Sequence, residues 1–567
     1  MLVYSSSQHP TEIQHKVADA LGLPMNSVRC EVRRMGGGFG GKESQGNHLA
    51  VACAVAAQLT GRPCKMRYDR DDDMHITGKR HDFRIDYHVG FDAEGRIEGI
   101  EFKQFCRCGW SMDLSLPVAD RAMLHADNAY YLPHIRIESH RLKTNTQSAT
   151  AFRGFGGPQG MVGVERVMDH VAHKLGLDPL VVRKRNYYSA SRDTTPYGMK
   201  VEDFILDEMT ESLVETSNYE ARRKSVSQWN AENQILKKGI ALTPVKFGIS
   251  FTLTHLNQAG ALVHVYSDGS IHMNHGGTEM GQGLFQKVAQ VAASRFGVGV
   301  DRVKITPTDT GKVPNTSATA ASSGSDLNGM AVQVACDTIR ERLATFVAER
   351  AQADPSTVVF RNGQIEVAGE SLSFNDVVKD AYMARVSLSS TGFYKTPKIV
   401  WDRIKGEGRP FFYFAYGAAV TEVVIDTLTG ENRILRADIL HDCGASLNPA
   451  IDIGQIEGAF VQGAGWLTTE ELVWDESGRL RTHAPSTYKI PACSDRPDVF
   501  NVALWDSENR EETVYRSKAV GEPPFMLGIS ALMALSDAVK SCGEAYPDLQ
   551  APATAESVLR AVNRVAG

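Results

Sequence analysis

The sequence predicts an α+β protein built from two mixed helix-and-sheet domains. Apolar residues at helical spacing alternate irregularly with β-hairpin patterns, and this mixture favours α+β domains over a regular parallel sheet. A series of helix, glycine and strand occurs near residue 20 and again near residue 295. The chain has 567 residues. At ~100–200 residues per domain, that length allows roughly two to four domains with full hydrophobic cores.

The first hundred residues show clear local patterns. Thr11 to Gln14 has the form of a helix capping box, and apolar residues then recur at helical spacing up to Gly22. Residues 28–32 alternate like a strand, and residues 49–59 form a second helical pattern after a glycine-rich turn. Residues 83–102 alternate on both sides of an Asp-Ala-Glu-Gly turn, which predicts a β-hairpin.

The rest of the chain repeats this mixture. Residues 164–175 and about 202–229 have helical patterns, and the polar stretch 231–238 suggests a boundary between domains at 1–235 and 236–567. A strand at 262–266 and a helix from residue 284 follow. Residues 18–30 resemble residues 293–305, with a glutamine ahead of each helix, so the sequence allows either an internal duplication or a chance similarity.

Composition and charge exclude several classes of protein. The net charge of -6 argues against nucleic-acid binding, which needs clustered positive charge. The first residues do not form a secretory signal, and no apolar run reaches the roughly 18 residues that a membrane span needs. Nine cysteines without a Cys-x-x-Cys pair indicate reduced thiols and no iron–sulfur site in this chain, with Cys106 and Cys108 on one strand face. We therefore expect a cytoplasmic protein that binds neither nucleic acid nor membrane.

A glycine-rich stretch at 36–43 contains a weak match to the dinucleotide-binding fingerprint. It also nearly matches a phosphate-binding P-loop, but Glu43 stands where a Ser or Thr would hold magnesium. The stretches at 151–160, 276–283 and 318–324 are of similar character, and each adjoins a predicted helix. Any one of them could be only a tight turn. Together they suggest an extended anionic ligand bound by backbone amides and helix N-termini.

These four stretches, with Gln8, residues 247–252 and residues 518–524, closely resemble the molybdopterin-binding large subunit of bacterial xanthine dehydrogenases, in the xanthine oxidase family of molybdenum hydroxylases. The resemblance spans essentially the whole chain. It implies that both predicted domains bind a molybdenum–molybdopterin cofactor that carries a sulfido ligand. The pterin supplies the sulfur ligands of the metal, so no direct side-chain ligand is expected. The residues implied to line the molybdenum and its pterin are Gln8, Phe39, Gly40, Arg153, Gln282, Ala320, Ala321 and Ser322, with Gln8, Phe39, Arg153 and Ala321 around the metal.

The resemblance also implies substrate-binding residues. Phe155 and Phe251 would form aromatic walls around a planar heterocycle, with Thr252 beside it. Glu43 and Arg121 would orient a purine through charge-assisted hydrogen bonds, and these two positions differ in aldehyde oxidases.

Glu522 is implied to be the general base that removes a proton from the attacking hydroxyl. Gly521 allows a close approach to the cofactor. Pro523 is expected to hold Glu522 in an extended conformation, and the pair Pro523 and Pro524 to start a helix near residues 527–535.

The implied reaction is the hydroxylation of hypoxanthine to xanthine and of xanthine to urate. Its electrons would pass through the 2Fe–2S clusters and FAD of a small partner subunit to NAD, in a higher heteromer. No segment of this sequence matches the hammerhead-type N-terminal domain of the family. Residues 2–4 have the pattern of the later part of a strand. We therefore expect an N-terminally truncated chain. The alternatives are an aldehyde-oxidase-like hydroxylase, a non-catalytic cofactor-binding scaffold and a nucleotide-binding protein.

Overall fold

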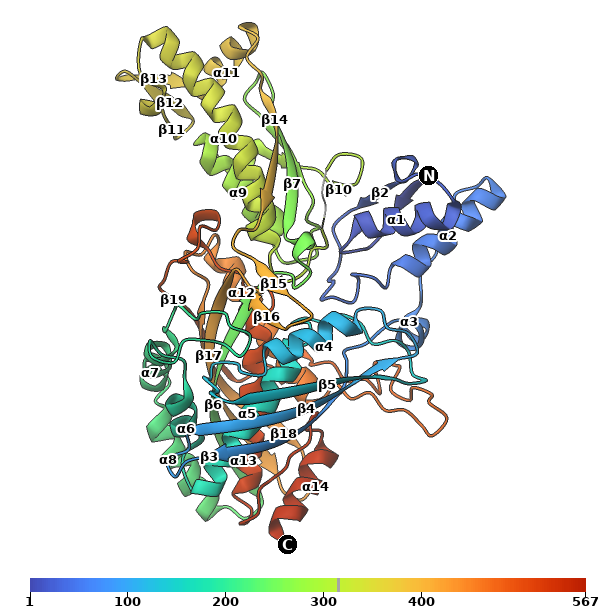
Figure 1. Ribbon diagram of the computed structural model, residues 1–567, viewed down its shortest axis with the longest axis vertical. Coiled ribbons are helices and arrows are strands. Elements are labelled where there is room, and N and C mark those ends of the chain that lie inside the picture. Colours follow the sequence, from blue (N-terminus) through green and yellow to red (C-terminus); the bar gives the residue numbers. More distant parts are fainter. Residues whose placement is uncertain (314–316) are drawn as a thin grey trace.

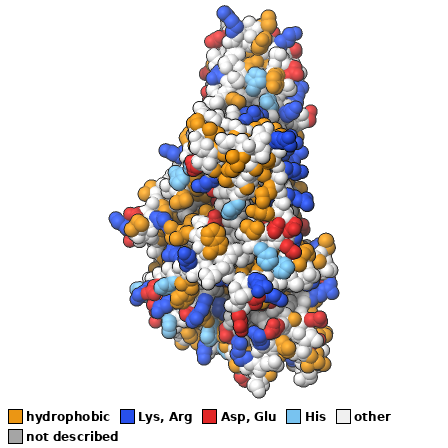
Figure 2. All heavy atoms as spheres, turned by 90° about the vertical axis from the view of Figure 1, so that its right-hand side faces the viewer, with side chains coloured by type: hydrophobic (Ala, Val, Ile, Leu, Met, Phe, Trp, Pro, Cys, Tyr) orange, Lys and Arg blue, Asp and Glu red, His pale blue; other side chains and the backbone are white. Residues whose placement is uncertain are grey.

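The structure is a computed structural model that describes residues 1–313 and 317–567. It has an elongated shape with an upper lobe, a lower lobe and an N-terminal unit beside them (Figure 1). Seen from the side of the N-terminal unit, hydrophobic side chains gather in the upper middle of the molecule, with charged groups of both signs around them (Figure 2). The sheets combine parallel and antiparallel pairs, as the prediction of an α+β protein requires.

The N-terminal unit joins the first helices to a small sheet. Strand β1 (Leu2–Tyr4) pairs in parallel with β2 (Arg29–Val32), which pairs with β10 (Thr308–Asp309) in antiparallel. Helix α1 (Pro10–Leu21) ends at Gly22 as predicted, and α2 (Asn47–Thr60) follows the glycine-rich loop. The predicted capping box at Thr11 is wrong, because α1 begins at Pro10 and its N-cap is His9, two residues before Thr11. Proline suits the first helical position because its missing N–H is not needed there.

The lower lobe contains the predicted hairpin. Strands β3 (Phe83–Phe91) and β4 (Ile97–Gly109) are antiparallel, and β5 (Ile135–Lys143) adds to β4 in parallel. Cys106 and Cys108 are both buried on one face of β4. The helical pattern over 202–229 is divided into two helices at Asn218, which has a left-handed φ of 54°. The helices of this lobe include α3 (Arg70–Ile76), α4 (Ser115–Leu124), α5 (Gly157–Leu175), α6 (Pro179–Asn186), α7 (Leu206–Thr216) and α8 (Tyr219–Glu232).

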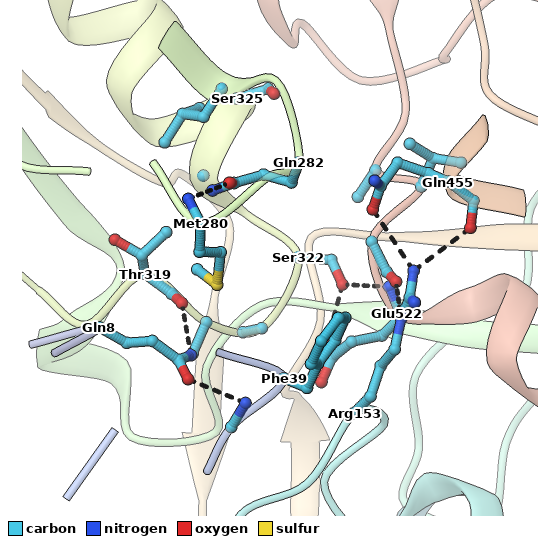
Figure 3. Close-up of a pocket in the computed structure, with 18 of the residues that line it drawn as sticks. Gln8, Phe39, Arg153, Met280, Gln282, Thr319, Ser322, Ser325, Gln455 and Glu522 are labelled. Atoms are coloured by element: carbon cyan, nitrogen blue, oxygen red, sulfur yellow. Dashed lines mark hydrogen bonds between the residues drawn. The ribbon is translucent and has the colours of Figure 1, made fainter. Parts of the chain in front are cut away.

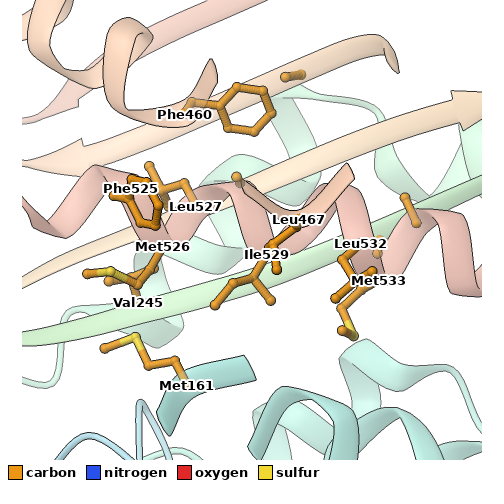
Figure 4. Close-up of a cluster of buried hydrophobic side chains, with 14 of the residues drawn as sticks. Met161, Val245, Phe460, Leu467, Phe525, Met526, Leu527, Ile529, Leu532 and Met533 are labelled. Carbon is orange, nitrogen blue, oxygen red and sulfur yellow. The ribbon is translucent and has the colours of Figure 1, made fainter. Parts of the chain in front are cut away.

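A four-stranded sheet in the order β19-β18-β17-β6 forms the centre of the lower lobe. Its bounds are β6 (Leu236–Ile249), β17 (Tyr413–Asp426), β18 (Asn432–Asp442) and β19 (Val499–Trp505). Helices α12 (Pro449–Thr468), α13 (Ile529–Lys540) and α14 (Ala555–Ala566) pack around the sheet and bury a large apolar core (Figure 4). Met526 and Leu527, which follow residues 521–524, are fully buried in this core.

The upper lobe packs helices on the sheet β14-β7-β8-β9. Its elements are β7 (Gln258–Val265), β8 (Ile271–His275), α9 (Leu284–Phe296), β9 (Val303–Ile305), α10 (Gly324–Ala351), β11 (Val359–Arg361), β12 (Gln364–Val367), β13 (Glu370–Ser373), α11 (Phe374–Met383) and β14 (Ser389–Lys395). Strands β15 (Val400–Asp402) and β16 (Glu407–Arg409) form a separate ribbon. Helix α9, a left-handed Gly297, a short 3₁₀ turn and β9 repeat the order of α1, Gly22, a 3₁₀ turn and β2. The two similar sequence segments therefore share one local structure.

The predicted division at residue 235 stays a prediction. Met209 and Val226, which precede it, share one buried core with Ile240 and Leu242, which follow it. The two segments are therefore packed together in the lower lobe.

Three chain-wide features bear on ligands. All nine cysteines are free thiols. Within residues 1–313 and 317–567, no group of three or more His, Cys, Asp or Glu side chains is arranged to hold a metal ion. None of the helices in the same residues combines the length and apolar character needed to cross a bilayer.

Leu532→Ala should lower the melting temperature markedly, because Leu532 is 0% exposed in the core around α13 (Figure 4). Removing a buried leucine side chain costs about 2–5 kcal/mol. Leu59→Ala is the matched control, since Leu59 is 82% exposed. Thermal unfolding measures both variants, and equal melting temperatures would contradict the assigned core.

Candidate cofactor and substrate site

A cavity of about 400 Å³ lies among the loops that the sequence singled out. This volume is within the ~300–1,000 Å³ typical of ligand pockets. Its wall includes Gln8 and residues of the four loops at 36–43, 151–160, 276–283 and 318–324. Helix α12 and the segment 517–522 also contribute to it. The cavity brings together eleven of the predicted site residues: Gln8, Phe39, Gly40, Glu43, Arg153, Phe155, Gln282, Ala320, Ala321, Ser322 and Glu522.

Left-handed backbone is concentrated in these loops. Phe39, Phe155, Ala321 and Ser322 all have φ between 51° and 57°. Such values cost about 1–3 kcal/mol for a residue with a side chain, and they persist only where neighbouring structure enforces them. All four residues line the cavity, so the strain is located where a ligand would contact the backbone.

The loops are fastened to one another by hydrogen bonds. The side chain of Gln8 donates to the carbonyl of Thr319 at 3.0 Å and accepts from the N–H of Gly40 at 2.9 Å (Figure 3). The N–H of Arg153 donates to the carbonyl of Phe39 at 2.8 Å. A Cβ at Gly40 would lie 2.8 Å from the backbone of residue 151, so only glycine allows this contact. The predicted residue Gln8 thus joins the loop at 36–43 to the loop at 318–324.

Gln282 fastens the third loop internally. Its side chain accepts from the N–H of Met280 at 2.7 Å and donates to the carbonyl of Thr278 at 2.9 Å (Figure 3). Met280 also accepts, through its backbone carbonyl, a hydrogen bond from Gly37 at 3.1 Å. The loop at 276–283 is therefore hydrogen-bonded to the loop at 36–43.

The carboxylate of Glu522 accepts two hydrogen bonds. The N–H of Gly154 donates to Oε1 at 3.0 Å, and the hydroxyl of Ser322 donates to Oε2 at 2.9 Å (Figure 3). The Ser322 hydroxyl oxygen also accepts from the N–H of Glu522 at 2.8 Å. Both carboxylate oxygens are therefore fixed at the cavity wall. The contact between Ser322 and Glu522 was not foreseen, since nothing in either local sequence indicates it.

The expected extended conformation of Glu522 is wrong. Its φ of -100° and ψ of -42° lie in the helical region, although a following proline disfavours that region. The three hydrogen bonds with Gly154 and Ser322 favour this conformation and offset the steric cost. Pro523 starts a 3₁₀ turn over Pro523–Gly528, which continues into α13, so a proline-initiated helical segment is confirmed with a tighter first turn.

Arg153 connects the second loop to α12 and to the Glu522 segment. Its Nε donates to the carbonyl of Gly521 at 2.6 Å, and its terminal nitrogens contact Gln455 and Gln462 at 3.3–3.4 Å. Burial lowers the pKa of Arg153 to about 10, and the charge of Glu522 opposes that change. Gln455 and Gln462 were missed from sequence because their spacing on one helix face is also that of ordinary helix residues.

Glu43 is a buried carboxyl group whose Oε2 has no hydrogen-bond partner in the described part of the chain. Burial, reinforced by the negative charges of Glu12, Glu522 and Asp113, raises the pKa of Glu43 to about 8. Below that pH the free site holds a neutral acid, which can donate a hydrogen bond. The purine-orienting role of Glu43 stays a prediction.

Arg121, Phe251 and Thr252 are not part of the cavity wall. Arg121 is buried, and its two terminal nitrogens donate to the carbonyls of Ser250 and Gly248. Its Nε has no hydrogen-bond partner among the described residues. Phe251 packs in the core of the upper lobe. The substrate-binding roles of these three residues stay predictions.

The cavity suits an anionic ligand. The N-terminal turns of α9 and α10 reach its wall through Leu284, Gly324 and Ser325. Helix N-termini carry partial positive charge and bind phosphate groups through free amides. The strained backbone, the helix ends and the unpartnered Glu43 together fit a large ligand with a phosphate and several polar groups, as the pterin cofactor has.

Two family profiles match the chain, at residues 1–187 and 212–497, and both are described as molybdopterin cofactor-binding domain. The chain belongs to this molybdopterin cofactor-binding family. The mixed-sheet fold and the cavity are therefore those of a cofactor-binding protein of that family.

Relatives in other organisms extend the match over nearly the whole molybdopterin-binding chain. It is 46% identical to a xanthine dehydrogenase/oxidase of Felis catus, over 99% of the chain and 41% of that protein. It is 44% identical to a xanthine dehydrogenase of Dictyostelium discoideum, over 98% of the chain and 40% of that protein. The resemblance drawn from the motifs is confirmed, and the chain spans about two fifths of the length of these relatives.

Solved structures show the same fold. Quinoline 2-oxidoreductase from Pseudomonas putida 86 superposes with a TM-score of 0.89 at 23% identity, covering 99% of the chain and 72% of that protein. The aldehyde oxidoreductase from Desulfovibrio gigas superposes with a TM-score of 0.83 at 25% identity, covering 99% and 57% respectively. Both molybdopterin cofactor-binding domains thus follow a known architecture.

Glu43→Gln should stabilise the protein more at pH 8 than at pH 5. A carboxyl with its folded-state pKa raised from 4.5 to about 8 loses stability as pH rises through that interval, because only the unfolded state releases the proton there. Glutamine removes this loss. The melting-temperature difference between variant and wild type should grow by roughly 2 °C or more. Glu94→Gln, on an exposed turn, is the control, and a constant difference for Glu43→Gln would contradict the assigned burial.

Proposed function

We propose that the chain is the substrate-hydroxylating part of a xanthine dehydrogenase, which converts hypoxanthine to xanthine and xanthine to urate. The observation that carries this proposal is the cavity in which Glu522, held through both oxygens, and the unpartnered Glu43 lie among the cofactor-binding loops. The relatives at 44–46% identity bear the names of xanthine-oxidising enzymes, which supports the substrate class.

The bound molybdenum–pterin group supplies the two-electron acceptor and the water-derived oxygen. Gln8, Arg153, Gln282 and the backbone of residues 320–322 would hold this group, together with Phe39 and Gly40. The hydrogen bonds between the loops would hold the reacting groups in alignment.

Glu522 acts as the general base. Its carboxylate accepts the proton released as oxygen is added to the purine carbon. The donors Gly154 and Ser322 hold it in one orientation, so little motion is needed before proton transfer. Glu43, as a neutral acid, donates a hydrogen bond to a ring nitrogen or carbonyl of the purine. Arg121, Phe155, Phe251 and Thr252 complete substrate binding in this proposal.

Electrons leave through a partner subunit that carries 2Fe–2S clusters and FAD and reduces NAD, in a higher heteromer. The two redox groups are proposed by analogy with the family, since the matched relatives are more than twice as long as this chain. A cytoplasmic location is also proposed. Nine free thiols support it, because reducing compartments keep cysteines unpaired.

A second candidate is an aldehyde hydroxylase. One observation favours it: both terminal nitrogens of Arg121 already donate to backbone carbonyls, so fewer of its N–H groups are free to orient a purine. Oε2 of Glu43 has no hydrogen-bond partner among the described residues, and this favours the purine as substrate. Substrate selectivity therefore separates the two candidates.

Glu522→Gln should retain molybdenum but lose turnover of xanthine by about 10²- to 10⁴-fold, the usual cost of losing a general base. Glutamine keeps an oxygen for Gly154 but cannot take up the proton. Metal analysis and steady-state kinetics on the purified complex provide the measurement, with Glu94→Gln as control. Near-normal turnover at full cofactor content would rule out this role.

Glu43→Ala and Arg121→Met should each lower kcat/KM for xanthine by about 10-fold or more, as expected for a lost hydrogen bond to a charged or strongly polar group. Oxidation of a simple aldehyde should change much less, because it lacks the ring groups that these side chains orient. The ratio of the two kcat/KM values is the readout. Equal losses on both substrates, with unchanged molybdenum, would favour the aldehyde hydroxylase.

A further inference from the structure

Arg80 occupies an aromatic cage behind the cavity wall. Its guanidinium carbon lies 4.4 Å from the ring centre of Phe152, 4.9 Å from that of Trp466 and 4.5 Å from that of Phe525. These rings come from the second loop, from α12 and from the turn after Glu522. One cation therefore contacts the three segments that surround Glu522, although Arg80 is not part of the cavity wall.

A series of hydrogen bonds leads from this cage to the proposed base. Nη2 of Arg80 donates to the carbonyl of Arg153 at 2.9 Å. The side chain of Arg153 donates to the carbonyl of Gly521 at 2.6 Å, and the N–H of Gly154 donates to Glu522 at 3.0 Å. The carbonyl of Arg153 and the N–H of Gly154 belong to the same peptide group. Arg80 therefore holds the peptide that itself holds the Glu522 carboxylate.

We propose that Arg80 is a positioning residue, which orients the peptide between Arg153 and Gly154 so that its N–H fixes the carboxylate of Glu522. The proposal rests on the function proposed above for Glu522. Guanidinium is suited to this task because it is flat, stacks on several rings and still presents an N–H donor at its edge. Lysine offers a donor without a stacking plane, and methionine fills the space without a donor.

Simple space filling does not account for Arg80. Burial among the rings lowers the pKa of its guanidinium to about 9. The fold therefore buries a charged group at a place where an apolar side chain would cost less free energy to bury. The attraction of Glu470, Glu522 and the Tyr488 oxygen opposes this change, and the repulsion of Arg153 adds to it. Costly polar groups of this kind are kept where a specific orientation is needed.

The test compares Arg80→Met and Arg80→Lys in the purified holoenzyme complex. Arg166→Met is the matched control, since Arg166 also lies over an aromatic ring, that of Tyr546, and donates to a backbone carbonyl, that of Leu549, outside the cavity wall. Arg80→Met should lower kcat for xanthine by about 10- to 100-fold, the effect of a misplaced catalytic group. KM should change less than about threefold, and molybdenum content should be retained. Arg80→Lys should recover part of kcat, while the control should stay near wild type.

Amide hydrogen exchange gives a readout that does not depend on turnover. Peptides covering 151–157 should exchange faster in Arg80→Met than in wild type, and Arg166→Met should leave them unchanged. This result would stand even if the complex did not oxidise purines, so it separates the positioning role from the proposed function. Unchanged exchange in Arg80→Met, or equal losses of kcat and melting temperature in Arg80→Met and Arg166→Met, would overturn the proposal. If Arg80→Met fails to fold, unchanged exchange and kcat in Arg80→Lys would overturn it as well.

Discussion

Both carboxylate oxygens of Glu522 accept hydrogen bonds from loops that are distant in sequence, and the rest of the site depends on this contact. The loops that carry Gly154 and Ser322 adopt left-handed backbone at Phe155 and at Ala321 and Ser322. That conformation is unfavourable by itself. The hydrogen bonds of Gln8 and Arg153 with neighbouring loops supply the constraint that keeps it.

The strained loops need a rigid base, which the lower lobe provides. Strands β6 and β17 pair over their full lengths, and α13 packs on both. The segment after Glu522 enters this core directly, since Met526 and Leu527 are fully buried (Figure 4). Glu522, at the cavity wall, is thus only a few positions from residues that are fully buried in this core. The apolar core therefore limits the movement of the proposed base.

Much of the fold could be predicted from sequence because its signals are local. The hairpin over β3 and β4, the ends of α1 and α5 at glycines and the strand character of residues 28–32 all follow from periodicity and turn residues. Predictions failed where distant parts of the chain or a proline decided the outcome. Pro10 moved the start of α1 away from Thr11, and contacts from two distant loops placed Glu522 in the helical region.

In the candidate site, too, features with a local sequence signal were predicted and features that depend on tertiary contacts were not. Glycine-rich motifs located the cavity, because left-handed and closely packed backbone needs particular residues in sequence. Gln455, Gln462 and Arg80 were not found, since each acts through tertiary contacts that leave no local pattern. The substrate roles that the resemblance implies for Arg121 and Phe251 stay predictions; Arg121 donates to backbone carbonyls, and Phe251 packs in the core of the upper lobe.

The two carboxyl groups of the cavity differ because their surroundings differ. Glu43 is buried, has no hydrogen-bond partner at Oε2 among the described residues and is close enough to Glu522 for their charges to repel, so its pKa rises to about 8. Glu522 accepts hydrogen bonds at both carboxylate oxygens, which fix its orientation at the cavity wall. In the proposed function, one cavity thus offers a neutral donor that orients the purine ring and a fixed acceptor for the proton of the attacking hydroxyl.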